Sequence, residues 1–436
     1  MEKDMQKLAA LEGEGFYTTT YEVVNDDSST TEVRTTYIAG NATVPVTDDD
    51  EYWANAYVGT ARGAGVDFSG STRNITVALG HDSDVSIADI VAQGGTAFES
   101  IAAVRGSYGN SEIYGSSAAE TLYAGMGDST IYGAGGRDVL YNDGGNEKYG
   151  SATFFFGVGD GKDTIYGFQE REENDATKAD VLFLDPSAED IEYRIVGDNL
   201  RISYNSSDQL TIVEGANDIL QINSDGVNTD VVAIGSELDY QRFVNHYIGL
   251  GNSAQVTVDD LVDGGDINIW MNLGTWAREN GVEGFEEFGV YEDIKVLDAR
   301  GFYEGATLVG GYETDNEIYA GRGTNSLWGG NGGDDTLYAG VGMSQYFYLN
   351  GDGTDVIEGA KNDEVVNLLN IGLEEFDFEG GPLSYDSDHI KLNFADGGSL
   401  DVKSSADVVF EIKDGSQWKL DRTANTLNYQ GGRREE

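Results

Sequence analysis

The residues of this chain most able to do chemistry are aspartates and glutamates set in glycine-rich turns. The sequence of 436 residues has 78 acidic and 26 basic side chains, a formal net charge of −52, with 60 glycines and no cysteine. Without thiolates a metal must be held by oxygen, which favours Ca²⁺ or Mg²⁺. The charge excludes a nucleic-acid partner, because phosphates require a basic surface. We therefore expect cations as the ligands of these turns.

These turns recur with a period of nine residues in two arrays. In the first array Gly106–Tyr141 reads GSYGNSEIY, GSSAAETLY, AGMGDSTIY and GAGGRDVLY, and VGDGKDTIY follows at Val158–Tyr166. The second array begins at Gly311 with GYETDNEIY, AGRGTNSLW and GNGGDDTLY, and NGDGTDVIE follows at Asn350–Glu358. An apolar residue fills the eighth position of every block: Ile113, Leu122, Ile131, Leu140, Ile165, Ile318, Leu327, Leu337 and Ile357.

The segments around the arrays are duplicated as well. Upstream, NITVALG at Asn74–Gly80 matches NIWMNLG at Asn268–Gly274, and downstream FFFGVGDGKDTIYG matches YFYLNGDGTDVIEG. Two tandem modules explain this order. We expect a short amphipathic linker helix at Ser236–Gly251, from the helical spacing of its apolar residues, and a β-hairpin at Gly15–Gly40. The predicted division is 1–60 (N-terminal segment with the hairpin), 61–235 (first module with its cap), 236–256 (helical linker), 257–424 (second module with its cap) and 425–436 (tail).

The nonapeptides resemble the RTX, or haemolysin-type calcium-binding, repeat, whose pattern is G-G-x-G-x-D-x-U-x. With its duplicated flanks the resemblance covers most of 61–424. It implies an all-β chain of two tandem parallel β-roll (β-solenoid) modules with β-rich caps. It also implies Ca²⁺ between stacked turns, held by aspartate carboxylates and main-chain carbonyls.

The sixth position of the repeat, which carries the calcium-binding carboxylate in the family, is degenerate here. About half of the blocks have Ser or Asn there. Glu120 lies eighteen residues before Asp138, on the same expected edge, and Asp128 is displaced by one position. The carboxylates expected to bind Ca²⁺ are Asp138, Asp160, Asp163, Asp334, Asp335, Asp352, Asp355, Glu120 and Asp128. The alternative is that degenerate turns fold without metal, although stacked carboxylates without a counter-ion would repel.

The ninth position is aromatic in nearly every block and should point outward. It forms either a stacked ladder that stabilises a flat sheet, or an exposed face for self-association or glycan binding. The aromatic positions that could form this face are Tyr114, Tyr123, Tyr132, Tyr141, Tyr166, Tyr319, Trp328 and Tyr338.

No catalytic constellation stands out in the sequence. His81, His246 and His389 lie in separate segments, and there is no G-x-S-x-G or P-loop motif. No apolar run approaches membrane-spanning length. We expect an extracellular or bacterial cell-surface calcium-binding structural protein, not an enzyme, that self-assembles as a surface-layer, filament or matrix subunit. The alternatives are a calcium-dependent adhesin for extracellular glycans and, second, a polysaccharide-active enzyme.

Overall fold

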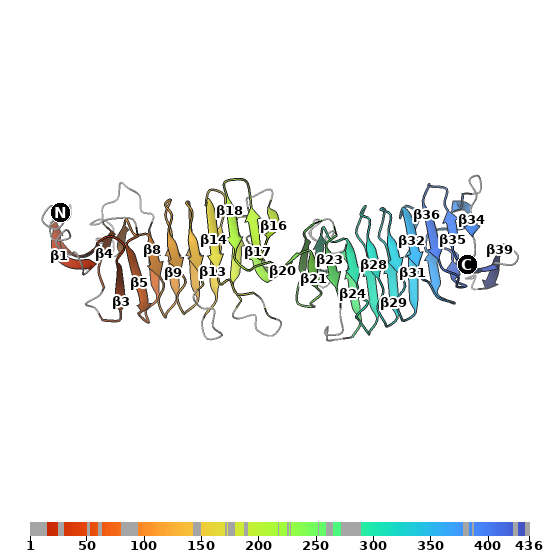
Figure 1. Cartoon of the computed structure of the whole chain (residues 1–436), viewed down its shortest axis with the longest axis horizontal. Coiled ribbons are helices and arrows are strands. Elements are labelled where there is room, and N and C mark those ends of the chain that lie inside the picture. The colour runs from red at the N-terminus through yellow and green to blue at the C-terminus, as the bar shows by residue number, and fades with distance from the viewer. Residues whose placement is uncertain are drawn as a thin grey trace. The chain divides into compact units, whose positions relative to one another are not determined.

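The computed structural model describes residues 15–24, 30–49, 53–59, 63–79, 95–142, 150–170, 172, 179–186, 191–216, 218–224, 226, 228–251, 253–258, 265–271, 289–377, 383–385, 388–421 and 426–431. The predicted hairpin turn at 25–29, His81 and residues 432–436 of the predicted tail lie outside this part of the chain. The chain divides into two compact units, Met1–Val231 and Val232–Glu436 (Figure 1).

In the first unit, successive strands of the coil alternate between two sheets in which neighbours pair mainly in parallel. The first sheet contains β3 (Thr43–Thr47), β5 (Gly65–Gly70), β8 (Ala103–Arg105), β10 (Thr121–Tyr123), β12 (Val139–Tyr141), β14 (Lys162–Tyr166), β18 (Gln209–Ile212), β17 (Asn199–Ser203) and β16 (Glu192–Val196). The second contains β6 (Ile75–Ala78), β9 (Ser111–Tyr114), β11 (Ser129–Tyr132), β13 (Ala152–Phe156), β15 (Val181–Leu184) and β19 (Ile219–Asn223).

The second unit repeats this alternation. One sheet contains β21 (Glu237–Asp239), β23 (Gln255–Thr257), β26 (Val296–Asp298), β28 (Glu317–Tyr319), β30 (Thr336–Tyr338), β32 (Thr354–Glu358), β36 (Ser399–Lys403), β35 (Ile390–Asn393) and β34 (Leu383–Tyr385). The other contains β24 (Ile267–Trp270), β27 (Ala306–Val309), β29 (Asn325–Trp328), β31 (Ser344–Tyr348), β33 (Val365–Leu368), β37 (Val409–Glu411), β38 (Gln417–Asp421) and β39 (Thr426–Gly431). A 3₁₀ turn, η2, spans Leu373–Glu375.

The chain is therefore an all-β, parallel β-roll, and the predicted fold class is confirmed. Parallel register places Leu122 beside Leu140 and Leu140 beside Ile165, so that the eighth positions stack along the axis of the coil. These side chains, and their counterparts in the second unit, are 0–1% exposed. Burying each one stabilises the coil by about 1.5–3 kcal/mol.

The predicted hairpin and caps are present. Strands β1 (Phe16–Val24) and β2 (Thr30–Ile38) pair antiparallel and continue into β4 (Ala56–Gly59) and β7 (Ala97–Glu99). Antiparallel strands β16–β17–β18 end one sheet of the first unit, and β34–β35–β36 end the matching sheet of the second. Parallel pairing already begins at β3, upstream of residue 61 where the first module was expected to start.

The predicted linker helix at Ser236–Gly251 is wrong. The segment forms β21 and β22 (His246–Gly249), and β22 pairs in parallel with β20 (Asp230–Gly235) and β25 (Val290–Glu292). All four residues of β22 are buried, and Tyr247 stacks on Tyr291 with ring centroids 5.0 Å apart. The apolar spacing fits a helix, but these β-branched and aromatic residues gain more by burial between strands, so packing overrides the periodicity.

The turns between strands lie along two edges of each coil. The "carboxylate edge" comprises turns 115–120, 133–138 and 157–161 in the first unit and 310–316, 329–335 and 349–353 in the second. The "opposite edge" comprises turns 106–110 and 124–128 in the first unit and 320–324, 339–343 and 359–364 in the second. Gly161 (φ 89°) and Gly353 (φ 106°) adopt left-handed conformations on the carboxylate edge, where a Cβ would also strike the carbonyl oxygen of the coil before.

Candidate metal centre

On the carboxylate edge of the first unit, three acidic residues stack from coil to coil. The register of β10, β12 and β14 places Glu120 beside Asp138 and Asp138 beside Asp163. The amide N–H of Glu120 donates to Oδ1 of Asp138 at 2.7 Å, and the N–H of Asp138 donates to Oδ1 of Asp163 at 2.8 Å. One oxygen of each aspartate is thus used to join adjacent coils.

The second unit repeats this arrangement with Asn316, Asp335 and Asp355. The N–H of Asn316 donates to Oδ1 of Asp335 at 2.7 Å, and the N–H of Asp335 donates to Oδ1 of Asp355 at 3.1 Å. We call these two stacks, Glu120–Asp138–Asp163 and Asn316–Asp335–Asp355, the carboxylate ladders. The expectation that Glu120 shares an edge with Asp138 agrees with this geometry.

Three of the four ladder aspartates have a second oxygen that is buried without a protein partner. Oδ2 of Asp138, Asp335 and Asp355 makes no hydrogen bond, although these residues are at most 1% exposed. A buried polar atom left unpaired costs about 1–3 kcal/mol, and more when it is charged. The ladders are therefore incomplete as protein-only structures.

Two other buried carboxylates, by contrast, have hydrogen-bond partners for both of their oxygens. The oxygens of Asp180 accept from the amide N–H of Ala152 and of Gln169 and from the side chain of Asn142. Those of Glu364 accept from the N–H groups of Ser344 and Lys361 and from the Tyr346 hydroxyl. Both carboxylates follow turns on the opposite edge and are satisfied by the protein, whereas Asp138, Asp335 and Asp355 on the carboxylate edge each keep one oxygen without a partner.

The unpartnered oxygens converge on glycine turns. Oδ2 of Asp138 and Oδ2 of Asp163 lie 3.1 and 3.2 Å from the position that a Cβ on Gly133 would occupy. A Cβ on Gly115 would lie against the carbonyl oxygen of Gly133 and 3.2 Å from Oε2 of Glu120. The Gly133 turn thus brings Oδ2 of Asp138 and of Asp163 together around a space that has no side chain, while both oxygens of Glu120 accept hydrogen bonds from Ser116.

Burial and mutual repulsion alter the acidity of the ladders. Desolvation, with the neighbouring charges of Asp163 and Glu120, raises the pKa of Asp138 to about 8, and desolvation raises that of Asp163 to about 7. Desolvation and the charge of Asp355 raise the pKa of Asp335 to about 9, and desolvation with nearby Asp352 raises that of Asp355 to about 8. Without a cation the ladders retain protons near neutral pH.

The ladders fit a hard, oxygen-binding cation. Across the described part of the chain, no three His, Asp or Glu side chains converge closely enough to hold a metal by themselves. A metal there would need main-chain carbonyls as further ligands, and the turns align these: a Cβ on Gly136 would meet the carbonyl of Ala118, and one on Gly161 that of Gly136. Carboxylates combined with carbonyls are the ligand set that Ca²⁺ takes in proteins.

The other four carboxylates that were predicted to bind Ca²⁺ are not members of the ladders. Asp352 is fully buried in the turn before Asp355; its Oδ2 accepts from Trp328 Nε1 at 2.8 Å and its Oδ1 has no partner. Its counterpart Asp160 is half-buried and accepts from the N–H of Gly157 at 2.6 Å. Asp334 is exposed and bonds the N–H of Thr354. Asp128 is exposed on the opposite edge, and the structure does not bring it to the ladders.

The ninth-position aromatics form face-to-face stacks. Tyr114, Tyr132, Phe155 and Phe183 stack along one sheet at centroid spacings of 4.1–4.6 Å, and Tyr123, Tyr141 and Tyr166 stack along the other at 4.6 and 5.0 Å. In the second unit Tyr319 and Tyr338 stack at 4.2 Å, while Trp328 bonds Asp352. Because the ring faces cover one another, mainly ring edges face solvent.

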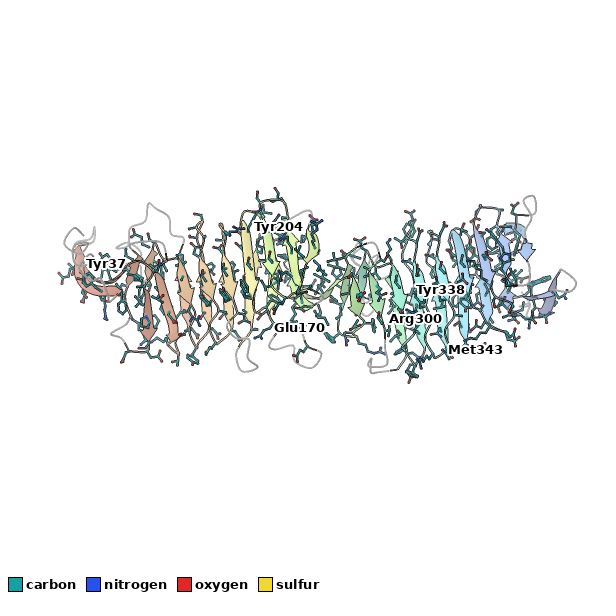
Figure 2. The ribbon with its side chains drawn as sticks, viewed as in Figure 1. Tyr37, Glu170, Tyr204, Arg300, Tyr338 and Met343 are labelled. Carbon is teal, nitrogen blue, oxygen red and sulfur yellow. The ribbon has the colours of Figure 1, made fainter. Side chains whose placement is uncertain are left out.

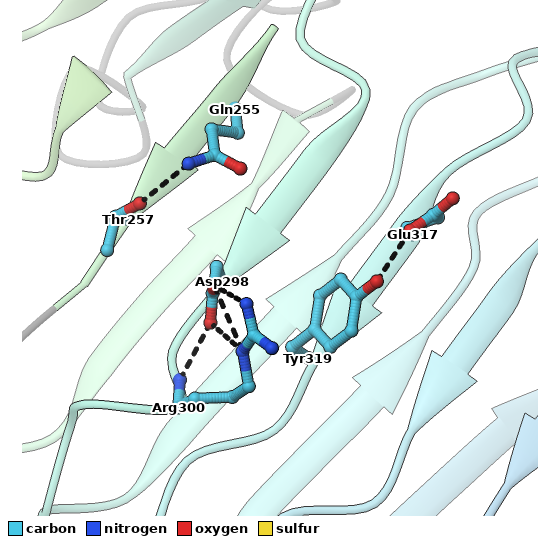
Figure 3. A network of polar contacts seen from close by, with 6 residues as sticks. All are labelled: Gln255, Thr257, Asp298, Arg300, Glu317 and Tyr319. Atoms are coloured by element: carbon cyan, nitrogen blue, oxygen red, sulfur yellow. Dashed lines mark hydrogen bonds and ion pairs between the residues drawn. The ribbon is translucent and has the colours of Figure 1, made fainter. Parts of the chain in front are cut away.

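An arginine caps the start of a tyrosine stack in each unit, which the sequence analysis missed. The guanidinium of Arg105 lies 4.4 Å from the Tyr123 ring centroid, and that of Arg300 lies 4.4 Å from the Tyr319 ring centroid. Asp298 holds Arg300 in place, and Glu317 accepts a hydrogen bond from the Tyr319 hydroxyl (Figure 3). Figure 2 labels Arg300 and Tyr338 in the same unit. The duplicated cap supports the interpretation of the stacks as structural ladders.

Asp180 and Glu364 were also missed, although a signal exists. Each lies two residues before a buried apolar residue, Leu182 or Val366, the same offset that separates Asp138 from Leu140. Both are sixth-position residues: Glu364 lies nine residues after Asp355, in step with the period, whereas Asp180 follows a longer turn that interrupts it.

The fold and the turn carboxylates define a parallel β-roll, and comparison with known proteins adds little beyond this. No family model matches the sequence, and no curated protein matches it. Among solved structures the chain is similar to the extracellular lipase LipA from Serratia marcescens, at 14% identity and a TM-score of 0.16. The likeness covers 68% of this chain and 38% of the lipase chain.

One expectation from the sequence is corrected by this comparison. The chain was predicted not to be an enzyme, and the matched solved structure is a lipase. The prediction that the chain is not an enzyme is therefore contradicted. Among the described helices, none is long and apolar enough to cross a membrane.

Proposed function

We propose that this chain is a calcium-binding β-roll protein of the haemolysin-type repeat class, whose fold is stabilised by Ca²⁺ between adjacent coils on the carboxylate edge. The observation that carries the proposal is the set of buried, unpartnered Oδ2 atoms of Asp138, Asp335 and Asp355. The formal charge of −52 adds to it, because a compact chain of that charge needs counter-ions.

The two carboxylate oxygens of each ladder aspartate have different roles. Oδ1 of each ladder aspartate accepts an amide N–H from the preceding coil and so fixes the orientation of the carboxylate. This directs Oδ2 towards the glycine turn, where main-chain carbonyl oxygens would supply the further ligands of a bound Ca²⁺. When bound, Ca²⁺ supplies the positive charge that allows both aspartates of a ladder to remain ionised.

The test is a pair of double variants that remove charge but keep the Oδ1 acceptor, Asp138→Asn with Asp163→Asn and Asp335→Asn with Asp355→Asn. We expect each pair to abolish calcium-dependent stabilisation of its own unit while raising the stability of the metal-free unit above pH 7, because repulsion is removed. Asp128→Asn is the matched control, since Asp128 is exposed on the opposite edge. Calcium titrations that are unchanged in both double variants would refute the proposal.

Calcium sites of extracellular modules typically bind at about 10⁻⁴–10⁻³ M. Sites in this range would fill outside a cell and stay empty in cytosol, so we propose an extracellular or cell-surface location. Folding would then be completed after export, as calcium becomes available.

We also propose that the protein self-associates as a structural subunit, on the basis of strand β1. Among the described strands, β1 lies at the end of the sheet β1–β2–β4–β7, and such an edge accepts a strand from another copy. Light scattering in millimolar Ca²⁺, with and without residues 16–38, tests this. A strict monomer in the intact chain would refute it. Glycan binding through the tyrosines has less support, because their ring faces already stack on one another.

A further inference from the structure

The opposite edge of the second unit contains a cation that the chain itself supplies. The ammonium of Lys361 lies 2.5 Å from the carbonyl oxygen of Gly340, 2.7 Å from that of Val341 and 2.5 Å from that of Gly342. Three successive carbonyls of one turn therefore point at a single positive charge, and all three N–H bonds of the ammonium are used.

The chain geometry explains why these carbonyls need a donor from elsewhere. A Cβ on Gly340 or Gly342 would strike the carbonyl of Gly321 or Gly323, so the turn is packed tightly on the preceding one. In that preceding turn, the sixth-position Asn325 satisfies the carbonyls itself, donating from Nδ2 to Gly323 at 2.8 Å and to Gly321 at 3.3 Å. The following turn has Ser344 at the sixth position, and serine has no second donor to offer.

The backbone around Lys361 holds the side chain in position. Its amide N–H donates to Oε2 of Glu364 at 2.8 Å, while Oε1 of Glu364 accepts from the N–H of Ser344 at 2.9 Å. Glu364 is 1% exposed and both of its oxygens have partners. Lys361 and Glu364 both lie in turn 359–364 and both contact turn 339–343 or Ser344 directly after it. The opposite edge therefore has a positive charge beside its buried carboxylate, whereas the carboxylate ladder has none.

We propose that turn 339–343 is a cation site of a second kind, whose permanent occupant is the Lys361 ammonium. The tethered ammonium replaces a free metal ion on the opposite edge, so that this edge folds independently of calcium. With the side chain removed, the three carbonyls form a latent site for a primary alkylammonium ion. This inference goes beyond the proposed calcium role and does not depend on it, since it concerns the other edge of the coil.

The test is chemical rescue of Lys361→Ala in calcium-saturated protein. The substitution removes three methylenes and the ammonium, which n-propylammonium replaces. We expect the melting temperature of the second unit to fall by roughly 4–8 °C, as for the loss of charge-assisted hydrogen bonds in a unit of this size. Millimolar to tens of millimolar n-propylammonium restores it, whereas tetramethylammonium at equal ionic strength, which has no N–H group, does not.

Two further variants separate the ammonium from its stem and from general charge. Lys361→Met keeps an aliphatic chain without donors and should melt as low as Lys361→Ala. Lys413→Ala removes an exposed lysine that pairs with Glu374 and Glu375, and should show neither the loss nor the rescue. If Lys361→Ala does not fold in buffer, the readout is the β-sheet signal recovered on refolding with n-propylammonium or tetramethylammonium.

Three results would overturn the inference: variants that melt within about 1 °C of the parent, equal rescue by tetramethylammonium, or no rescue by n-propylammonium. The parent protein melted with and without Ca²⁺ reports on the carboxylate ladders separately. A failure of the calcium proposal therefore leaves the Lys361 result interpretable.

Discussion

The carboxylate ladders predict that the metal-free protein loses stability as pH rises from acid to neutral. The folded-state pKa values of Asp335 and Asp355, about 9 and 8, lie above the ordinary value of 3.8 for an unfolded aspartate. Between these values the folded chain binds more protons than the unfolded chain. The stabilisation from this difference is complete below about pH 4 and is lost as pH rises through the folded-state pKa.

The magnitude follows from the number of protons retained. Each carboxyl that keeps its proton on folding contributes a slope of about 1.4 kcal/mol per pH unit, so two carboxyls in the second unit give at most about 2.7 kcal/mol per pH unit between pH 5.5 and 6.5. For a unit of this size that corresponds to a fall in melting temperature of roughly 5–10 °C per pH unit. Asp138 and Asp163, with pKa values of about 8 and 7, act in the same direction in the first unit.

The assay is thermal unfolding followed by circular dichroism between pH 5.5 and 8.0, on protein freed of metal by chelation and gel filtration. Calcium binds the ionised carboxylates, so saturating Ca²⁺ should remove most of the slope and the gain from Ca²⁺ should grow with pH. Replacing all four ladder aspartates by Asn should reduce the metal-free slope in both units and leave the part that comes from Asp180 and Asp352, because burial raises their pKa values to about 7 and about 6. A metal-free melting temperature that is constant or rises across this range would refute the reasoning.

Three further predictions concern the coil itself. Gly353→Ala should destabilise the second unit by about 2–4 kcal/mol in urea unfolding, because a Cβ would strike the carbonyl of Gly333. The control Gly397→Ala, at a similar φ but with open space around the Cβ, should cost only about 1 kcal/mol. Equal losses would contradict the stacking of the turns. Ile131→Ala should cost about 2–5 kcal/mol, since Ile131 is fully buried, and a loss below 1 kcal/mol would contradict the core assignment. Arg105→Gln should cost about 0.5–1 kcal/mol through lost contact with Tyr123 and alter the tyrosine near-ultraviolet dichroism; an unchanged spectrum would argue against the cap.

Much of the coil follows from the sequence, because each nonapeptide is a local unit. An apolar eighth residue must be buried, and the nine-residue period places alternate blocks on the same sheet, so Leu122 and Leu140 stack as expected. The same argument brings Glu120 and Asp138 to one edge, whereas Asp163 follows after a longer turn and is placed there by the register of β12 with β14. The duplicated order of segments extends the prediction to Asp335 and Asp355.

The remaining features depend on contacts between coils that the period does not encode. Residues of the predicted linker helix have a spacing that suits both a helix and a strand, and only the pairing of β22 with β20 and β25 decides between them. A longer turn before Asp180 interrupts the period and conceals its sixth position, whereas Glu364 lies nine residues after Asp355 and keeps the period. The contact of Lys361 with Gly340 spans 21 residues and exists only because turns of successive coils stack.

The central claim is that the unpartnered ladder oxygens bind calcium. It is tested most directly by anomalous diffraction from crystals grown in Ca²⁺. The account predicts anomalous peaks within about 2.3–2.6 Å of Oδ2 of Asp138 and of Asp335, each with carbonyl oxygens in its coordination sphere, and no peak at turn 339–343. Crystals in millimolar Ca²⁺ that show no peak on the carboxylate edge would contradict it.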